Sequence, residues 1–359
     1  MPWYQKHLLV TLSSHGYGHA VMTAALINQL QKRYPELKIT LRTTLPRPFL
    51  EGKFHAPFKY LPQSCDVGML MNSAFAVDRP NTLQAYRAFH ADWQGRIADE
   101  QRILSAIAPD LVISNIAYLP LVAAQQLGIP AIAMSCLNWA DIFTYFFPDE
   151  NAIHQQIVAA YRSANCFIRT QPTMPMSELT TRTVAPLAAI GNNQRQQLMK
   201  ALNLAAATQL VLVSMGGIKT ELNAPRWPVL DNIHYIAANA VDEVDRPDIT
   251  PIEALNISYN DLLSSCDLLL TKPGYGSFTE AACNNMPVLY VCRDEWPEQR
   301  YMTEWLRQQV PCTKITLEQF MKGEFSRPLQ QLLQTARPTT TPTTGVEEAI
   351  EIIVSYLKP

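Results

Sequence analysis

Short apolar runs that lead directly into glycine-bearing loops and then into helices constrain this chain more than any other feature. Residues 8–12 form such a run, the loop at residues 13–19 follows at once, and residues 20–34 carry apolar residues at helical spacing until Pro35. A strand, a tight loop and a helix in immediate succession form the first unit of a parallel α/β sheet. The sequence therefore predicts an α/β fold.

The same succession recurs along the chain. Further strands are predicted at residues 38–43, 109–114, 131–135, 210–213, 268–270 and 287–291. Further helices are predicted at residues 87–107 and 119–127, and from Phe278 and Arg300 onward. In such sheets ligands bind at the carboxyl ends of the strands, where the strand order reverses. The unusual loops of this chain all follow predicted strands, so we expect them at that edge.

Two proline- and threonine-rich stretches divide the pattern. Residues 169–186 carry three prolines and are predicted to be a linker, and residues 337–345 form a second break. A single core rarely grows past roughly 250–300 residues, and this chain has 359. We therefore predict a domain over residues 1–170, a second over residues 190–335 and a tail helix within residues 346–359.

Composition excludes several classes of protein. The net charge of −2 gives no global field that would hold nucleic acid. No apolar stretch approaches the roughly 18 residues that span a bilayer, although peripheral membrane contact is left open. The amino terminus lacks the layout of an export signal, and the seven cysteines are scattered without a C-x-x-C pair. We expect a cytoplasmic protein with reduced thiols and make no prediction of its oligomeric state.

The loop at residues 274–277 can approach an anion closely. Gly274 and Gly276 have no side chains, so an anion can come close to the backbone. The helix that follows offers unpaired N–H groups and the positive end of its dipole. Gly216 and Gly217 form a second such loop, and Glu280 lies one helical turn past Gly276, where it could accept from ribose hydroxyls. The alternative is a tight turn without a ligand, with Glu280 a favourable first-turn acid.

Other nucleotide and metal motifs are absent from the sequence. Residues 217–220 lack the Gly-Lys pair of a Walker A loop, and Val21 replaces the third glycine of a dinucleotide fingerprint. No Asp-x-Asp occurs, and residues 242–245 have the wrong spacing. We therefore expect no metal bridging a diphosphate and no cofactor.

Two histidines lie in the first loop. His15 and His19 are expected at the carboxyl end of the first strand. A neutral imidazole with a pKa of about 6.5 can take a proton from an alcohol at neutral pH. The alternative for either histidine is a structural hydrogen bond.

Several segments together resemble the two-domain nucleotide-sugar glycosyltransferases of the GT-B type. The resemblance is closest to the MurG-like branch, and closer still to the transferase-like amino-terminal region of plant L-arabinokinases. It runs intermittently over most of residues 8–310. The matching segments are residues 16–20, 66–68, 77–78, 110–114, 138–139, 214–217, 272–281 and 293–294, of which residues 272–281 are fairly specific.

The resemblance implies two Rossmann-like doubly wound domains that face a cleft, with the tail helix packing back on the first. It implies that the second domain binds a nucleotide-sugar donor. Gly274, Gly276 and Ser277 would hold the diphosphate near Gly216 and Gly217, and Glu280 would bind ribose. Lys272 and Tyr275 belong to the same motif. Glu298 and Gln299 would contact the donor sugar, the alternative being a solvated helix start.

The resemblance also implies that His19 is a general base. Related enzymes often place an aspartate after the strand predicted at residues 109–114 to orient this histidine, but here the position is Asn115. Asp66, Asp78 or Asp141 could replace the missing acid. Another acceptor-side group comprises His15, Gly18, Asn138 and Trp139. The aromatic run near Trp139 could stack a sugar, form core or form a dimer patch.

The sequence thus predicts an inverting, metal-independent glycosyltransferase. It would move a sugar from a nucleotide diphosphate to an unidentified hydroxyl acceptor. We expect the nucleotide to be UDP, with GDP and dTDP as alternatives. A sugar-nucleotide sensor or partner subunit without activity is the alternative that Asn115 suggests. A nucleotide-sugar epimerase of the same fold ranks lower because its usual first loop differs from residues 14–18.

Overall fold

The computed structural model describes residues 5–72, 76–216, 222–238, 246–292, 295–338 and 344–358. The chain forms two compact units, one of Met1–Leu187 with Thr344–Pro359 and the other of Ala188–Thr343. Each unit is an α/β structure built on one parallel sheet, and each is described by itself.

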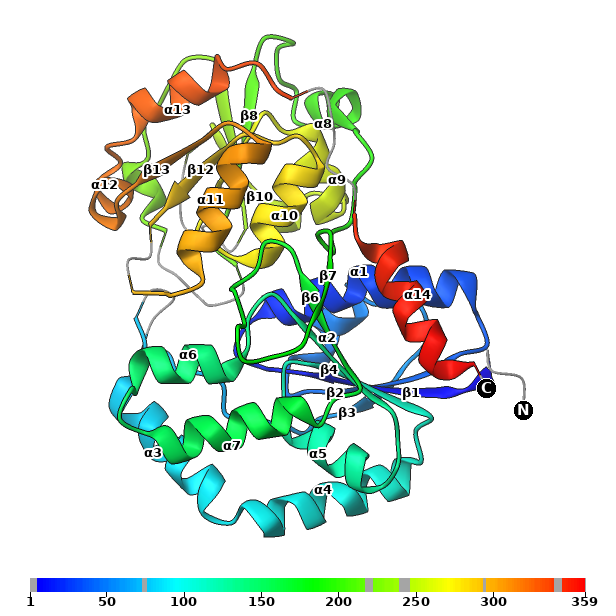
Figure 1. Ribbon diagram of the computed structural model, residues 1–359. Helices are drawn as coiled ribbons and strands as arrows, with labels where there is room; N and C mark the ends of the chain where they lie inside the picture. The colour runs from blue at the N-terminus through cyan, green and yellow to red at the C-terminus, as the bar shows by residue number, and fades with distance from the viewer. Residues whose placement is uncertain are drawn as a thin grey trace. The chain divides into compact units, whose positions relative to one another are not determined.

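The first unit holds a seven-stranded parallel sheet of order β3-β2-β1-β4-β5-β6-β7. Its strands are β1 (His7–Leu12), β2 (Lys38–Arg42), β3 (Lys59–Leu61), β4 (Leu111–Asn115), β5 (Ala131–Ser135), β6 (Cys166–Thr170) and β7 (Arg182–Val184). Its helices are α1 (Tyr17–Arg33), α2 (Arg47–Glu51), α3 (Arg79–Ala91), α4 (Trp93–Ile107), α5 (Leu119–Gln126), α6 (Trp139–Phe146), α7 (Asn151–Arg162) and α14 (Val346–Leu357). Helices α1 and α14 cover one face and α3–α7 the other (Figure 1).

The second unit holds a six-stranded parallel sheet of order β10-β9-β8-β11-β12-β13. Its strands are β8 (Gln209–Ser214), β9 (Ile233–Ala237), β10 (Ile249–Pro251), β11 (Leu268–Thr271), β12 (Val288–Val291) and β13 (Cys312–Ile315). Its helices are α8 (Arg195–Ala201), α9 (Tyr259–Ser265), α10 (Tyr275–Cys283), α11 (Gln299–Gln309), α12 (Leu317–Lys322) and α13 (Ser326–Leu333).

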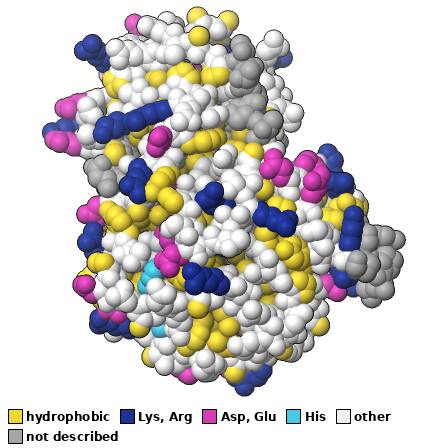
Figure 2. Space-filling model, viewed as in Figure 1, with side chains coloured by type: hydrophobic (Ala, Val, Ile, Leu, Met, Phe, Trp, Pro, Cys, Tyr) yellow, Lys and Arg dark blue, Asp and Glu magenta, His cyan; other side chains and the backbone are white. Residues whose placement is uncertain are grey.

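Central strands read as continuous apolar runs because helices bury both faces of a parallel sheet. Leu8, Leu9 and Val10 in β1 have no exposed surface, nor do Leu268 and Leu269 in β11. Helix α14 packs against α1 and β7, and Glu347 pairs with Arg33 at 3.1 Å. On the face in view, positive and negative side chains are interspersed (Figure 2). No helix in the described part of the chain is long and apolar enough to cross a bilayer.

Three elements differ from the sequence-based expectation. The helix predicted over residues 87–107 is two helices, because Asp92 caps α4 by accepting a hydrogen bond from the backbone N–H of Gly95 at 3.2 Å. The predicted linker at residues 169–186 contains the short edge strand β7, paired with β6. Helix α10 begins at Tyr275, three residues before the predicted start at Phe278, so Gly276 and Ser277 lie in its first turn.

Candidate active site

Each sheet reverses its strand order at one point, and both points carry predicted site residues. In the first unit the reversal lies between β1 and β4, where Leu12 pairs with Asn115. In the second unit it lies between β8 and β11, where Ser214 pairs with Thr271. Both sheets therefore contain the central strand order of doubly wound nucleotide-binding folds, which bind ligands at such points.

His19 and Asn115 meet at the first reversal. His19 lies in the first turn of α1 and is 7% exposed, and Asn115 ends β4 with no exposed surface. The imidazole Nδ1 lies 2.9 Å from the Asn115 side-chain oxygen. Asn115 thus occupies the place that the sequence assigned to an orienting partner.

Burial sets the charge of this histidine. Desolvation lowers the pKa of His19 to about 4, and the hydrogen bond to Asn115 opposes the shift only in part. A neutral amide cannot stabilise an imidazolium by charge as a carboxylate does. His19 is therefore a neutral imidazole at pH 7.

The side chain of Asp66 is hydrogen-bonded to that of Trp139. The indole N–H of Trp139 donates to the Asp66 carboxylate at 2.9 Å, and Ser13 also hydrogen-bonds it. Burial raises the pKa of Asp66 while these bonds oppose the rise. The Trp139 ring lies 6.1 Å from the ring of His19 and 5.3 Å from that of His15, between centroids. Trp139 thus contacts Asp66 and lies near both histidines, while the Nδ1 of His19 is bound to Asn115.

Other acceptor-side residues serve local structure or leave space open. Asp78 caps α3 by accepting from the Asn81 N–H at 3.2 Å, and Asn138 caps α6 by accepting from the Asp141 N–H at 2.8 Å. Burial raises the pKa of Asp141. Gly18 is exposed, and a Cβ added there would meet no atom within 4 Å.

Of the aromatic run after Trp139, most rings are core. Phe143, Phe146 and Phe147 are buried, and Tyr145 is 54% exposed. His15 is also held locally, with its Nδ1 2.9 Å from the carbonyl oxygen of Met69.

A glycine begins the helix at the second reversal. Helix α10 begins after Gly274, which as the N-cap residue has no side chain to cap the helix. A Cβ added at Gly274 would meet no atom within 4 Å. Because the first N–H groups of a helix and its dipole favour an anion, and because Gly274 lets the backbone be approached closely, this start can bind one.

Lys272 and Gly216 lie beside this helix start. Gly216 has a φ of +75°, and the Cε of Lys272 lies 3.4 Å from where its Cβ would stand. The hydroxyl of Thr271 donates to the carbonyl of Ser214 at 2.6 Å and ties β11 to β8. The predicted site residue Gly217 and the segments at 242–245 and 293–294 lie outside the described residues.

The predicted donor-side acids are both buried and hydrogen-bonded. Glu280 is 5% exposed and accepts from the Asn260 amide at 3.1 Å. Glu298, also 5% exposed, accepts from the Trp296 indole at 3.0 Å. The Gln299 amide contacts the sulfur of Cys292 at 3.3 Å. These bonds fix the position of each carboxylate.

Two residues that hydrogen-bond to the predicted site residues were not identified from the sequence. Thr23 contacts the Asn115 amide, and its spacing of four from His19 places both on one helix face, which was an available signal. Asn260 also bonds the carbonyl of Ala189, 71 residues away, and no sequence pattern indicated it.

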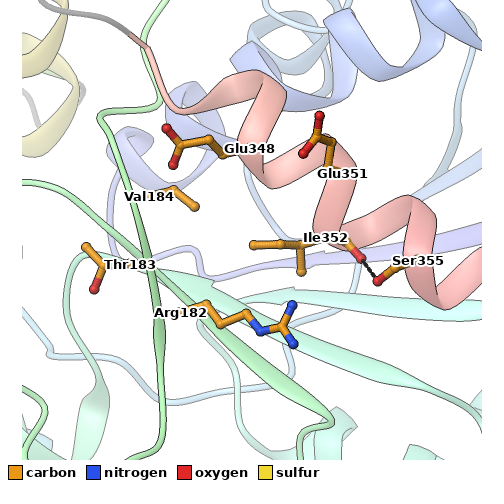
Figure 3. A pocket seen from close by; sticks show the side chains of 7 residues that line it. All are labelled: Arg182, Thr183, Val184, Glu348, Glu351, Ile352 and Ser355. Carbon is orange, nitrogen blue, oxygen red and sulfur yellow. Dashed lines mark hydrogen bonds between the residues drawn. The ribbon is translucent and has the colours of Figure 1, made fainter.

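A pocket of about 390 Å³ lies elsewhere in the first unit. It is lined by β7 and α14, with Arg182 on one side and Glu348 and Glu351 on the other (Figure 3). It shares no residue with the predicted site. Within the described ranges, no group of three or more His, Cys, Asp or Glu side chains is placed to hold a metal ion.

Structural relatives identify the architecture. The calicheamicin glycosyltransferase CalG4 matches with a TM-score of 0.64 and 15% identity, covering 98% of this chain and 94% of CalG4. The chain has the GT-B fold. Arabidopsis thaliana UGT89C1 complexed with quercetin matches with a TM-score of 0.63 and 14% identity over 98% of this chain and 99% of its own.

The GT-B fold is also shared with an epimerase. A UDP-N-acetylglucosamine 2-epimerase matches with a TM-score of 0.52 and 15% identity, covering 98% of this chain and 95% of its own. These matches confirm the predicted GT-B architecture, and assignment to the MurG-like branch stays a prediction.

Sequence comparison gives one curated relative and no family. The chain is 23% identical to the L-arabinokinase of Arabidopsis thaliana over 335 residues, which are 91% of this chain and 32% of that protein. The chain thus spans about a third of the length of this relative, and the predicted resemblance to L-arabinokinases is confirmed. A comparison with models of protein families gives no match.

Proposed function

We propose that this protein is a glycosyltransferase that moves a sugar from a nucleotide diphosphate donor, a UDP-sugar, to a hydroxyl acceptor. The observation that carries the proposal is the glycine-bearing start of α10 at the strand reversal of the second unit, with the Lys272 side chain beside Gly216. The GT-B fold supports it, as do the solved complexes of UGT89C1 and of S. aureus MnaA with UDP.

The helix start would bind the donor diphosphate. Each hydrogen bond to a charged oxygen contributes about 1.5–3 kcal/mol, so three or four reach the roughly 8 kcal/mol of micromolar binding. Gly274, Gly276 and Ser277 would supply the N–H groups, and Lys272 is placed to add positive charge. The same groups would stabilise the leaving diphosphate in the transition state without a metal ion.

His19 would act as the general base. The acceptor hydroxyl would transfer its proton to the imidazole as its oxygen bonds to the anomeric carbon. The bond from that carbon to the diphosphate breaks in the same step, and the electron pair leaves with the nucleotide. One displacement without an enzyme nucleophile inverts the anomeric centre.

The carboxylates of the second unit would recognise the rest of the donor. Glu280 would accept from ribose hydroxyls, and Glu298 with Gln299 would contact the sugar. Each acid already accepts a hydrogen bond from a neutral donor, which orients it before the ligand arrives.

A sensor or partner subunit that binds a sugar nucleotide without turnover is the second candidate. It is favoured by one observation, the neutral Asn115 on a histidine whose pKa burial lowers to about 4. Such an imidazole is a weak base. An epimerase is supported only by the shared fold.

Titration calorimetry with UDP, GDP and dTDP separates these functions when it is followed by a donor-consumption assay. We expect micromolar UDP binding and UDP release from a UDP-sugar that depends on an added acceptor. Tight UDP binding without release on any acceptor would select the sensor. Absence of binding to all three nucleotides would overturn the donor site.

A further inference from the structure

The side-chain nitrogen of Asn115 contacts two polar groups of helix α1. Its Nδ2 lies 2.9 Å from the hydroxyl oxygen of Thr23 and 3.2 Å from the carbonyl oxygen of His19. The Thr23 hydroxyl in turn donates to that same carbonyl at 2.8 Å. Thr23 and Asn115 have no exposed surface, so these bonds do not compete with bulk water.

These contacts decide which end of the amide faces the imidazole. A carbonyl oxygen can only accept, so the NH₂ end of Asn115 must face the carbonyl of His19. The Thr23 hydroxyl donates its hydrogen bond to the His19 carbonyl and accepts one from the NH₂ group of Asn115. The amide oxygen is therefore left to face Nδ1 of the ring, 2.9 Å away.

The orientation of the amide fixes the proton on the ring. An amide oxygen accepts, so Nδ1 of a neutral His19 must carry the hydrogen and Nε2 must be bare. We infer that Thr23 is a positioning residue that, through Asn115, holds His19 as a single neutral tautomer with Nε2 as its proton acceptor. The tautomer itself does not depend on the proposed function. Only the role of Nε2 in accepting a proton from the acceptor hydroxyl rests on it.

The groups around position 115 can pair with every polar atom of an amide but not with both oxygens of a carboxylate. A carboxylate at position 115 would turn its second oxygen toward the carbonyl of His19 and the oxygen of Thr23, with only the Thr23 hydroxyl able to donate to it. The site therefore orients its histidine through hydrogen bonds alone and adds no negative charge beside the ring.

Two variants separate the hydroxyl of Thr23 from its packing. Thr23→Val keeps the volume and loses the hydroxyl, whereas Thr23→Ser keeps the hydroxyl and loses the methyl group. If the hydroxyl positions Asn115, Thr23→Ser behaves as the wild type and Thr23→Val does not. If Thr23 only fills space, the order of the two variants is reversed.

The measurement is nitrogen NMR of the full chain labelled at its seven histidines, without any ligand. The His19 signals are assigned by their loss in His19→Gln. At pH 6–8 we expect a protonated Nδ1 and a bare Nε2. In Thr23→Val we expect the Nδ1 proton to exchange with water about fivefold faster, as for loss of one hydrogen bond, with Thr23→Ser unchanged.

A protonated Nε2 in the wild type would overturn the inference even if neither variant folds. Unchanged exchange in Thr23→Val would overturn the role of Thr23. For transfer, Thr23→Val should lower kcat severalfold and leave the donor KM unchanged. Because the NMR needs no substrate, failure to find transfer refutes the proposed function and leaves the tautomer result standing.

Discussion

The strand reversals of the two units share one topology and differ in what they present. In the first unit the reversal is filled by buried side chains, with His19, Asn115 and Thr23 satisfying one another. In the second unit, α10 begins after Gly274, which has open space around it as Gly16 has before α1, and the side chain of Lys272 lies beside Gly216. We therefore propose side-chain proton chemistry at the first reversal and anion binding by backbone N–H groups and Lys272 at the second.

The largest expected effect comes from removing the imidazole. His19→Ala should lower transfer by roughly 10²–10⁴-fold, because general base catalysis contributes about that much. UDP affinity, measured by calorimetry, should not change, since the proposed donor-binding groups lie in the second unit. The exposed His55→Ala is the matched control. Unchanged transfer in His19→Ala would remove the proton chemistry from the first unit.

The stability of the protein should depend on pH through the same group. The folded pKa of His19 is about 4, below the roughly 6.5 of an unfolded histidine. Between these values the unfolded state takes up a proton that the folded state does not, so stability falls as pH falls from about 6.5 to 4. The loss is about 3 kcal/mol.

Chemical denaturation at pH 7 and pH 4 tests this difference. His19→Gln should lose about 3 kcal/mol less than the wild type between these pH values. The other buried histidines contribute equally to both proteins, and His55→Gln is the control. Equal pH dependence in the wild type and His19→Gln would mean that His19 is not desolvated as described.

An aspartate at position 115 tests whether the first unit needs charge. Asn115→Asp should destabilise the fold at pH 7 by about 1–3 kcal/mol, because a buried oxygen would face the carbonyl of His19. Denaturation measures the change, and the exposed Asn256→Asp is the control. Undiminished stability together with faster transfer would show that the site accommodates a charged partner.

The smallest effect expected concerns the backbone site. Gly274→Ala should weaken UDP binding by about tenfold, or about 1.4 kcal/mol, because the added methyl group would stand where we propose that the diphosphate binds. Stability should change by less than about 1 kcal/mol, because φ is −167° and the added Cβ meets no atom within 4 Å.

Gly16→Ala is the matched control in the first unit. Gly16 also precedes a helix at a strand reversal, has extended backbone and has open space around it. Its replacement should leave UDP affinity unchanged. Equal effects of the two substitutions on UDP binding would abolish the distinction between the reversals.

Strands and loops could be predicted because buried parallel strands are continuous apolar runs bounded by glycines. The errors fall where local signals are short. Asp92 and Gly95 together make a helix cap inside an otherwise helical pattern, and β7 spans only Arg182–Val184. A three-residue edge strand has too few positions for a pattern to show.

The residues of the candidate site could be predicted from the sequence, but not all of their hydrogen-bond partners could. His19 and Asn115 were each identified after a predicted strand, and the structure joins them at 2.9 Å. The contact of Glu280 with Asn260 was not predictable, because it joins two helices whose approach depends on the packing of the second unit. The catalytic and binding roles of these residues stay predictions.

The sequence by itself determined the strand–loop–helix units and the placement of His19 and Gly274 after strands, since these follow from local periodicity and from the conformational freedom of glycine. Only the tertiary structure decided which way the Asn115 amide points and that His19 is neutral. Both depend on burial and on hydrogen bonds between residues as far as 96 positions apart, which no local pattern encodes.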